Sequence, residues 1–231
     1  MDQPPPLETL IARHLTAQLG DAATAEALTA ILLDDALTWQ APTVPLAEVR
    51  TIIGFTFGNR MCPNGNREPG PVNQALGDIA VRLHAATRAR IFAQWEVAEA
   101  IGGRLPADRL VPIYPERGPD AEPRYLNTAG VVDAILAAEP AGLGTVAVVA
   151  VRDHAWRCVE IFRTRGLPAG LPEGFAMPDT YDADSGQPWT RDRLTYLLHD
   201  LHCRALDRRD ALAAARPAPT SFVRRSAPAA R

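Results

Sequence analysis

The chain has 231 residues, with 24 basic and 27 acidic side chains and a net charge of −3, and every basic residue is an arginine. Because lysine is absent, the sequence excludes a lysine-containing phosphate-binding loop, a Schiff-base lysine and a pyridoxal-phosphate anchor. The length predicts one main domain of about 200 residues, which is enough to bury a sizeable core.

The charges are unevenly distributed along the chain. Residues 207–231 contain six arginines and two acids, for a charge of +4, whereas the rest contains 18 arginines and 25 acids, for a charge of −7. An acidic body is a poor match for phosphate backbones, so no nucleic-acid partner is expected. The stretch 207–231, rich in Ala, Pro and Arg, is predicted to be a disordered basic tail, either a solvated end or an interaction arm.

The sequence indicates neither a membrane partner nor secretion. No window of about 18 apolar residues occurs, and the start, Met1–Pro6, lacks the basic and apolar regions of a signal peptide. The three cysteines, Cys62, Cys158 and Cys203, are widely separated and form no CxxC pair. These features predict a cytoplasmic protein with reduced thiols.

Two helices are predicted at the N-terminus. Apolar residues recur at three-to-four spacing over 7–15 and again over 27–36, before two prolines break the pattern within 40–45. We expect residues 1–45 to form a helical hairpin that packs on the core of the main domain.

From residue 46 to residue 206, short apolar strands alternate with amphipathic helices. This alternation implies right-handed βαβ crossovers, and it predicts an α/β, Rossmann-like, doubly wound fold with a mainly parallel sheet. A C-terminal helix follows, and its four leucines at 194, 197, 198 and 201 are expected to form its buried face. The expected strands are 51–58, 90–94, 110–114 and 145–151, and the expected helices are 72–86, 95–101, 127–138 and 155–165.

Doubly wound sheets bind ligands at the carboxyl ends of their strands, near the point where the strand order reverses. The loops that follow Phe57, Phe92, Tyr114 and Val151 are therefore the expected position of a site. No GxGxxG fingerprint follows the first strand, so the sequence gives no reason to expect a dinucleotide, and the cofactor stays unidentified.

Arg152, His154 and Arg157 follow the strand 145–151, where the chain turns into a helix. His154 and Arg157 are three residues apart, so both can lie on one side of the first helical turn. Backbone N–H groups and an arginine fork at this position favour an anion, and a phosphate or carboxylate is the expected ligand group. The alternative is that Asp153 caps the helix and the arginines are solvated.

Two other loops supply candidate ligand-binding residues. Gln94 and Glu96 follow the second strand, and Glu96 either compensates the helix dipole or faces a ligand. Asn59 and Arg60 begin a loop that is long for a strand-to-helix connection, and both could donate hydrogen bonds to a ligand.

Two polar groups further along the chain carry weaker signals. Asn127 and Thr128 open a helix and are candidate ligand-binding residues, although a role for Asn127 as the N-cap is sufficient to explain that residue. His199, His202 and Cys203 have the spacing of a metal cluster on a helix, but no fourth ligand lies nearby, so no metal is expected.

The segment 146–166 resembles the last strand-helix unit of the YdcF-like family, the SanA, ElyC and YdcF type of domain, in its apolar strand and its His-x-x-Arg spacing from His154 to Arg157. The segments 52–58 and 92–98 and the pair Asn127-Thr128 are similar to earlier elements of that family. The resemblance covers residues 50–170 and implies a divergent, soluble member with a Rossmann-like fold and a site built from these loops. It also implies that S-adenosylmethionine is a candidate ligand.

The sequence thus predicts a cytoplasmic protein that binds a small anionic or nucleotide-like ligand, such as S-adenosylmethionine or a phosphorylated metabolite. Arg152, His154 and Arg157 would hold the anion. If the protein is a hydrolase or transferase, His154 or Glu96 is the expected general acid or base. The alternative is a non-catalytic interaction or regulatory protein that docks through its N-terminal helices and basic tail.

Overall fold

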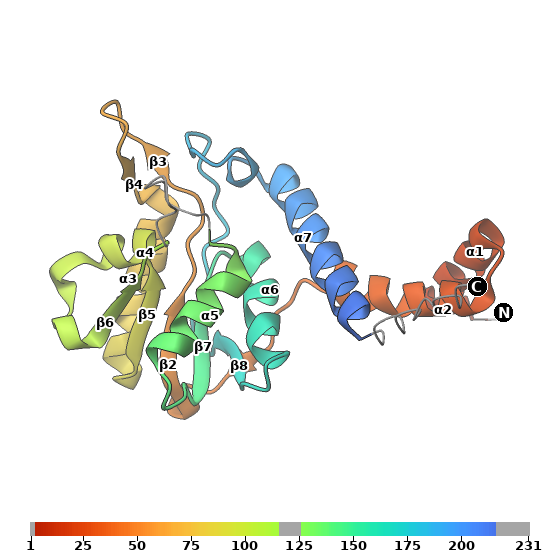
Figure 1. Cartoon of the computed structure of the whole chain (residues 1–231), viewed down its shortest axis with the longest axis horizontal. Coiled ribbons are helices and arrows are strands. Elements are labelled where there is room, and N and C mark those ends of the chain that lie inside the picture. Colours follow the sequence, from red (N-terminus) through yellow and green to blue (C-terminus); the bar gives the residue numbers. More distant parts are fainter. Residues whose placement is uncertain (1–2, 116–125, 216–231) are drawn as a thin grey trace, which may run out of the picture.

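The computed structural model describes residues 3–115 and 126–215. Its core is a six-stranded sheet in which every pair of neighbouring strands is parallel (Figure 1). The α/β, doubly wound, Rossmann-like fold that the alternating pattern predicts is therefore confirmed. The strands lie in the order β1 (Thr43–Val44), β8 (Ala169–Pro172), β7 (Thr145–Val149), β2 (Val49–Gly54), β5 (Arg90–Gln94) and β6 (Leu110–Ile113).

Helices cover both faces of the sheet and divide the core in two. Ile52 points to the face covered by α3 (Gly70–Thr87) and α4 (Trp95–Ile101), and Ile53 points to the opposite face. Successive residues of a strand point to opposite faces, so a strand covered on both sides is buried along nearly its whole length. β2 shows this, since Arg50 is its one exposed residue. The helices on the second face are α5 (Thr128–Ala138) and α6 (Arg152–Arg163).

The helix predicted at 155–165 begins three residues earlier, at Arg152, so Arg152 and His154 belong to its first turn. The strand expected at 51–58 ends at Gly54, and its last four residues form the loop at the edge of the sheet. β1 and β8 were not predicted. A Cβ at Gly170 in β8 would lie 2.8 Å from the carbonyl oxygen of Pro42, so the close approach of the chain at this point requires a glycine. Because glycine has a low propensity for strands, the sequence did not indicate a strand here.

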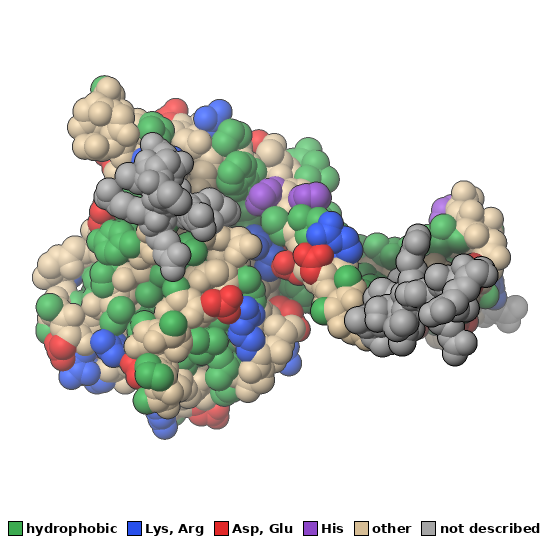
Figure 2. Space-filling view, in the orientation of Figure 1, with side chains coloured by type: hydrophobic (Ala, Val, Ile, Leu, Met, Phe, Trp, Pro, Cys, Tyr) green, Lys and Arg blue, Asp and Glu red, His purple; other side chains and the backbone are tan. Residues whose placement is uncertain are grey.

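The N-terminal hairpin consists of α1 (Leu7–Leu19) and α2 (Ala22–Ile31), which pack against each other. The expectation that this hairpin packs on the core is not met, because α1 and α2 project away from the sheet (Figures 1 and 2). The π-helical turn η1 (Leu32–Ala36) continues α2 and packs against α7 (Arg193–Ala214). α7 is the long C-terminal helix, and it lies between the hairpin and the core (Figure 1).

The buried face of α7 differs from the predicted one. Leu194 and Leu198 are 69% and 61% exposed, and the buried side chains are those of Tyr196, Asp200 and Arg204. These three residues also recur every four positions, but polar side chains at that spacing are normally read as a solvated face. α7 continues to Ala214, so residues 207–214 are helical rather than part of a disordered tail, and 216–231 lie outside the described residues.

Candidate functional site

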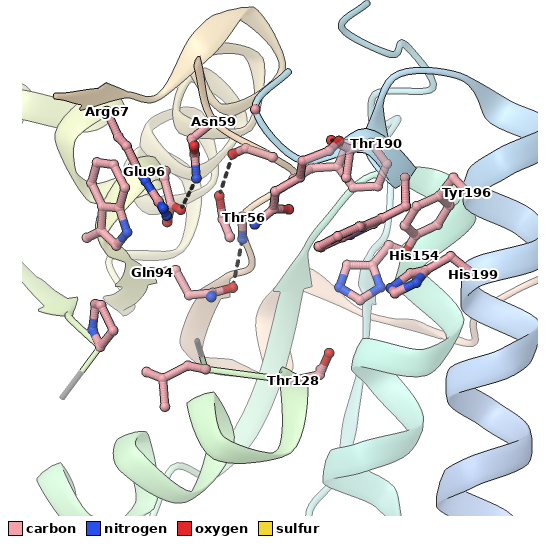
Figure 3. A pocket seen from close by; sticks show the side chains of 18 of the residues that line it. Thr56, Asn59, Arg67, Gln94, Glu96, Thr128, His154, Thr190, Tyr196 and His199 are labelled. Atoms are coloured by element: carbon pink, nitrogen blue, oxygen red, sulfur yellow. Dashed lines mark hydrogen bonds between the residues drawn. The ribbon is translucent and has the colours of Figure 1, made fainter. Parts of the chain in front are cut away.

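A cavity of about 390 Å³ opens at the carboxyl ends of β2, β5 and β7. This volume is within the range of small-molecule sites. β5 lies on one side of β2 and β7 on the other, so the cavity marks the point where the strand order reverses. It is lined by Thr56, Phe57, Gly58, Asn59, Met61, Arg67, Gln94, Trp95, Glu96, Ile113, Pro115, Leu126, Thr128, His154, Arg157, Gly186, Gln187, Pro188, Trp189, Thr190, Tyr196 and His199 (Figure 3).

Two segments that carry no strand of the main sheet complete the cavity wall. The antiparallel hairpin of β3 (Arg60–Met61) and β4 (Arg67–Glu68) contributes Met61 and Arg67, and the loop 186–190 contributes all five of its residues. Arg60 of β3 is paired with Asp182, four residues before that loop, because its Nε and Nη2 donate to the two carboxylate oxygens of Asp182, both at 2.8 Å. Sequence reasoning placed Arg60 against the ligand. The structure instead gives it this contact with Asp182.

Gly58 lies in the loop that follows β2, where this loop packs against Ser185 and Thr190. Its φ of +71° is in the left-handed region, and an added Cβ would overlap with the hydroxyl oxygens of Ser185 and Thr190. We expect Gly58→Ala to lower the free energy of unfolding by about 2 kcal/mol more than Gly65→Ala, as measured by urea denaturation. Gly65 is the matched control, since its φ is +81° but nothing lies near its Cβ position. Equal losses would contradict this packing.

Glu96 lies at one end of the cavity, in the first turn of α4, beside Asn59 and Arg67 (Figure 3). Its Oε1 accepts a long hydrogen bond of 3.4 Å from Asn59 Nδ2, and its Oε2 is buried without a hydrogen-bond partner among the described residues. Burial raises the pKa of Glu96 to about 7, against the opposing hydrogen bond from Asn59 and charge of Arg67. A carboxyl group with this pKa can exchange a proton near neutral pH.

His154 lies at the other end of the cavity, beside Tyr196 and His199, and Gln94 lies between the two ends (Figure 3). Arg157 Nη2 is 3.3 Å from His154 Nδ1. Because a guanidinium can only donate, Nδ1 must accept, and the ring proton is on Nε2. Burial and the charge of Arg157 lower the pKa of His154 to about 4, so the ring is neutral at physiological pH.

The same network orients Thr128. Its Oγ1 accepts a hydrogen bond of 2.7 Å from Arg157 Nη1, so its own O–H remains to donate. Arg157 uses three of its five N–H groups on Asp200, Thr128 and His154. Gln94 Oε1 accepts from the backbone N–H of Thr56 at 2.9 Å, so its amide nitrogen is also left to donate. The wall around His154 therefore presents hydrogen-bond donors to the cavity.

A buried charge cluster supports this wall from behind. Asp200, which is fully buried, accepts from Arg157 Nε and from Arg204 Nε, both at 2.7 Å, and from the hydroxyl of Tyr196 at 3.2 Å. Burial alone would raise the pKa of Asp200, but the charges of Arg157 and Arg204 hold it well below its usual range. Asp200 Oδ1 is also 3.8 Å from His154 Nδ1, which is too far for a hydrogen bond.

The predicted site residues separate into two groups. Six of them, Asn59, Gln94, Glu96, Thr128, His154 and Arg157, line the same cavity. Arg60, Asn127 and Arg152 do not. Asn127 caps α5 by accepting from the backbone N–H of Gly130 at 2.8 Å, and Arg152 pairs with Asp179 at 2.8 Å with half of its side chain exposed. Arg152 therefore does not line the cavity, whereas Arg157, in the second turn of α6, does.

Sequence reasoning missed the cavity residues that come from beyond the sheet. Tyr196 and His199 lie on α7, and Trp189, whose ring stacks on that of His199 at 5.0 Å, lies in the preceding 3-10 turn η5 (Pro188–Thr190). Tyr196 and His199 could have been found from the polar side of α7, but the leucines of this helix predicted a different buried face. No group of three or more potential metal ligands occurs among the described residues, and Cys203 Sγ lies 3.6 Å from His199 Nε2.

Comparison with known proteins adds no assignment. No family model matches the chain, and neither does any curated protein or solved structure. Among the described residues, no helix is both long enough and apolar enough to span a membrane. The function must therefore be argued from the cavity itself.

Proposed function

We propose that this protein is a cytoplasmic protein that binds a small anionic, nucleotide-like ligand in the strand-end cavity. The observation that carries the proposal is the set of donors at one end. His154, Thr128 and Arg157 line this end, and the bonds from Arg157 to His154 Nδ1 and Thr128 Oγ1 leave the ring Nε2–H and the Thr128 hydroxyl to donate to a ligand. Several donors around one point in a largely buried site favour an oxyanion, such as a phosphate or carboxylate.

At the opposite end of the cavity, Glu96 is placed to transfer a proton to or from a bound ligand. Its carboxyl group has a pKa of about 7, so it can take a proton from a bound ligand or water, or return one, at neutral pH. His154 is less suited to this role, because its low pKa and its bond to Arg157 keep it neutral. If the protein is a hydrolase or transferase, we infer that Glu96 is the general acid or base and His154 a hydrogen-bond donor.

The resemblance to the YdcF-like family is consistent with this function but is itself a proposal. It concerns the loops that form the cavity, and S-adenosylmethionine and phosphorylated metabolites are the ligand classes to which it points. Trp95 in the cavity wall supplies an aromatic ring for the heterocycle of such a ligand.

The test is to identify what the purified protein carries. Denaturing the purified protein is expected to release a small anionic molecule, which mass spectrometry identifies. Adding this molecule to the ligand-free protein should raise the melting temperature of the protein. His154→Ala and Thr128→Val should abolish most of this rise, whereas Arg152→Ala, a control on the same helix as His154 but outside the cavity, should leave it intact. A ligand without an anionic group, or equal shifts in all variants, would contradict the proposal.

The second candidate function is a non-catalytic interaction protein, and one observation favours it. α1 has no buried residue, and Leu7, Leu10 and Leu19 on it are 58%, 47% and 49% exposed. The two functions make different demands, because docking through α1 requires nothing of the cavity. A protein that carries no small molecule, and in which His154→Ala changes no measurable property except stability, would favour this second function.

A further inference from the structure

The donor end of the cavity carries a definite charge, and this charge restricts the kind of anion that fits. The buried cluster contains two guanidinium groups, those of Arg157 and Arg204, and one carboxylate, that of Asp200. Their side chains are 12%, 2% and 0% exposed, so water screens them little. The two titratable side chains that hydrogen-bond to these charges, those of His154 and Tyr196, are neutral, so the net charge of the five side chains is +1.

The carboxylate of Asp200 lowers the net charge of the cluster from +2 to +1. It lies between the two arginines, with its Oδ1 on Arg157 and its Oδ2 on Arg204, at 2.7 Å each. Arg204 is held on its other sides by the rings of Trp39 and Trp156, at 4.2 and 4.3 Å, so it cannot swing away to leave Asp200 unpaired. The three charges therefore act on the cavity as one fixed unit.

From this arrangement we infer that Asp200 makes the site selective for a singly charged oxyanion, a carboxylate or a phosphodiester, over a doubly charged phosphate monoester. A singly charged group balances the cluster, whereas a second negative charge would be buried without a partner, which is strongly unfavourable. This inference rests on the proposed function and specifies the ligand class of the same site.

The test uses small anions, so that it does not depend on the identity of the whole ligand. Acetate, dimethyl phosphate and methyl phosphate are titrated into isotope-labelled protein at pH 8, where methyl phosphate is doubly charged, and the NMR shifts of Thr128 and His154 are followed. We expect acetate or dimethyl phosphate to bind at least 10-fold more tightly than methyl phosphate. Which of the two binds more tightly distinguishes a carboxylate ligand from a phosphodiester.

Asp200→Asn then tests the cause. This substitution raises the net charge of the cluster to +2, and the preference should shift by at least 10-fold toward methyl phosphate. Asp210→Asn, at an exposed position on the same helix, should leave the preference unchanged. Thr128→Val removes a donor without changing the charge, so it should weaken all three anions while their ratio stays constant.

The possible failures are distinguishable. Equal binding of singly and doubly charged anions in the unmodified protein, or an unchanged ratio in a folded Asp200→Asn variant, would overturn the selectivity and leave the proposed function standing. If Asp200→Asn does not fold, the ratios in the unmodified protein and in Thr128→Val still decide the question. Binding of none of the anions at these residues would overturn both the selectivity and the proposed anion site.

Discussion

Replacing Arg204 by alanine is expected to lower the free energy of unfolding by about 3–5 kcal/mol, a large share of the stability of a domain of this size. The side chain is almost fully buried, and it is the link between three parts of the chain. It donates to Asp200 within α7, and its Nη1 donates to the carbonyl oxygens of Asp35 and Thr38 in the segment that leads from the hairpin to the sheet, at 2.8 and 2.6 Å.

The expected loss has two sources. Asp200 would keep only Arg157 as a charged partner, and the two carbonyl groups would lose a charged donor. In addition, the guanidinium lies between the rings of Trp39 and Trp156, and its removal would leave a gap between two large side chains. Urea denaturation followed by tryptophan fluorescence measures the loss.

Arg208→Ala is the matched control. Arg208 is one turn further along α7 and also bonds to the hairpin segment, through Asp35, at 2.6 and 2.9 Å. Its side chain is 41% exposed, so the ion pair is screened by water and should contribute only about 1 kcal/mol or less. Losses of similar size in the two variants would show that burial of Arg204 does not decide its contribution.

The sheet could be predicted from the sequence because its signals are local. The apolar runs at β2 and β7 and the helical spacing in α3 each follow from burial of a strand on two faces or of a helix on one. β1 and β8 could not be predicted. β1 has two residues and so no periodicity, and β8 contains Gly170, which is required there by its close contact with Pro42. Such contacts depend on segments far apart in the chain.

The site could be predicted in the part that belongs to the sheet. Glu96 and His154 lie in the first turns of the helices that follow β5 and β7, and parallel strands bring their carboxyl ends to one edge. The choice between Arg152 and Arg157 could not be made from spacing, because both flank His154 and only the start of α6 decides which one faces the cavity. Asp200 was missed because a single acid on a helix is normally solvated, and its two arginine partners come from different turns and elements.

Replacing Glu96 by glutamine is expected to stabilise the protein by about 3 kcal/mol at pH 8 and to leave its stability unchanged at pH 4.5. The pKa of Glu96 rises from 4.5 to about 7 on folding, so between these values the folded state binds more protons than the unfolded state. Stability contributed by such a group falls as the pH rises, and 2.5 pH units correspond to about 3 kcal/mol. Glutamine resembles the neutral carboxyl group and avoids this loss.

His154 has the opposite effect on the pH dependence. Its pKa falls from 6.5 to about 4 on folding, so the unfolded state binds more protons in this window and stability falls as the pH decreases. In the unmodified protein the two contributions oppose each other between about pH 4.5 and 6.5, and the net dependence from this pair should be nearly flat. In Glu96→Gln only that of His154 remains, so this variant should lose about 2 kcal/mol over the same range.

Urea denaturation at pH 8, 6.5 and 4.5 tests both statements at once, with Glu99→Gln as the control. Glu99 is on the same helix but exposed, and its replacement should change the stability by less than about 0.5 kcal/mol at each pH. If Glu96→Gln is no more stable than the unmodified protein at pH 8, the carboxylate has a partner that offsets its burial. A gain would mean that the chain retains a destabilising carboxyl group in the cavity wall, as expected where a side chain is kept for the chemistry of a bound ligand.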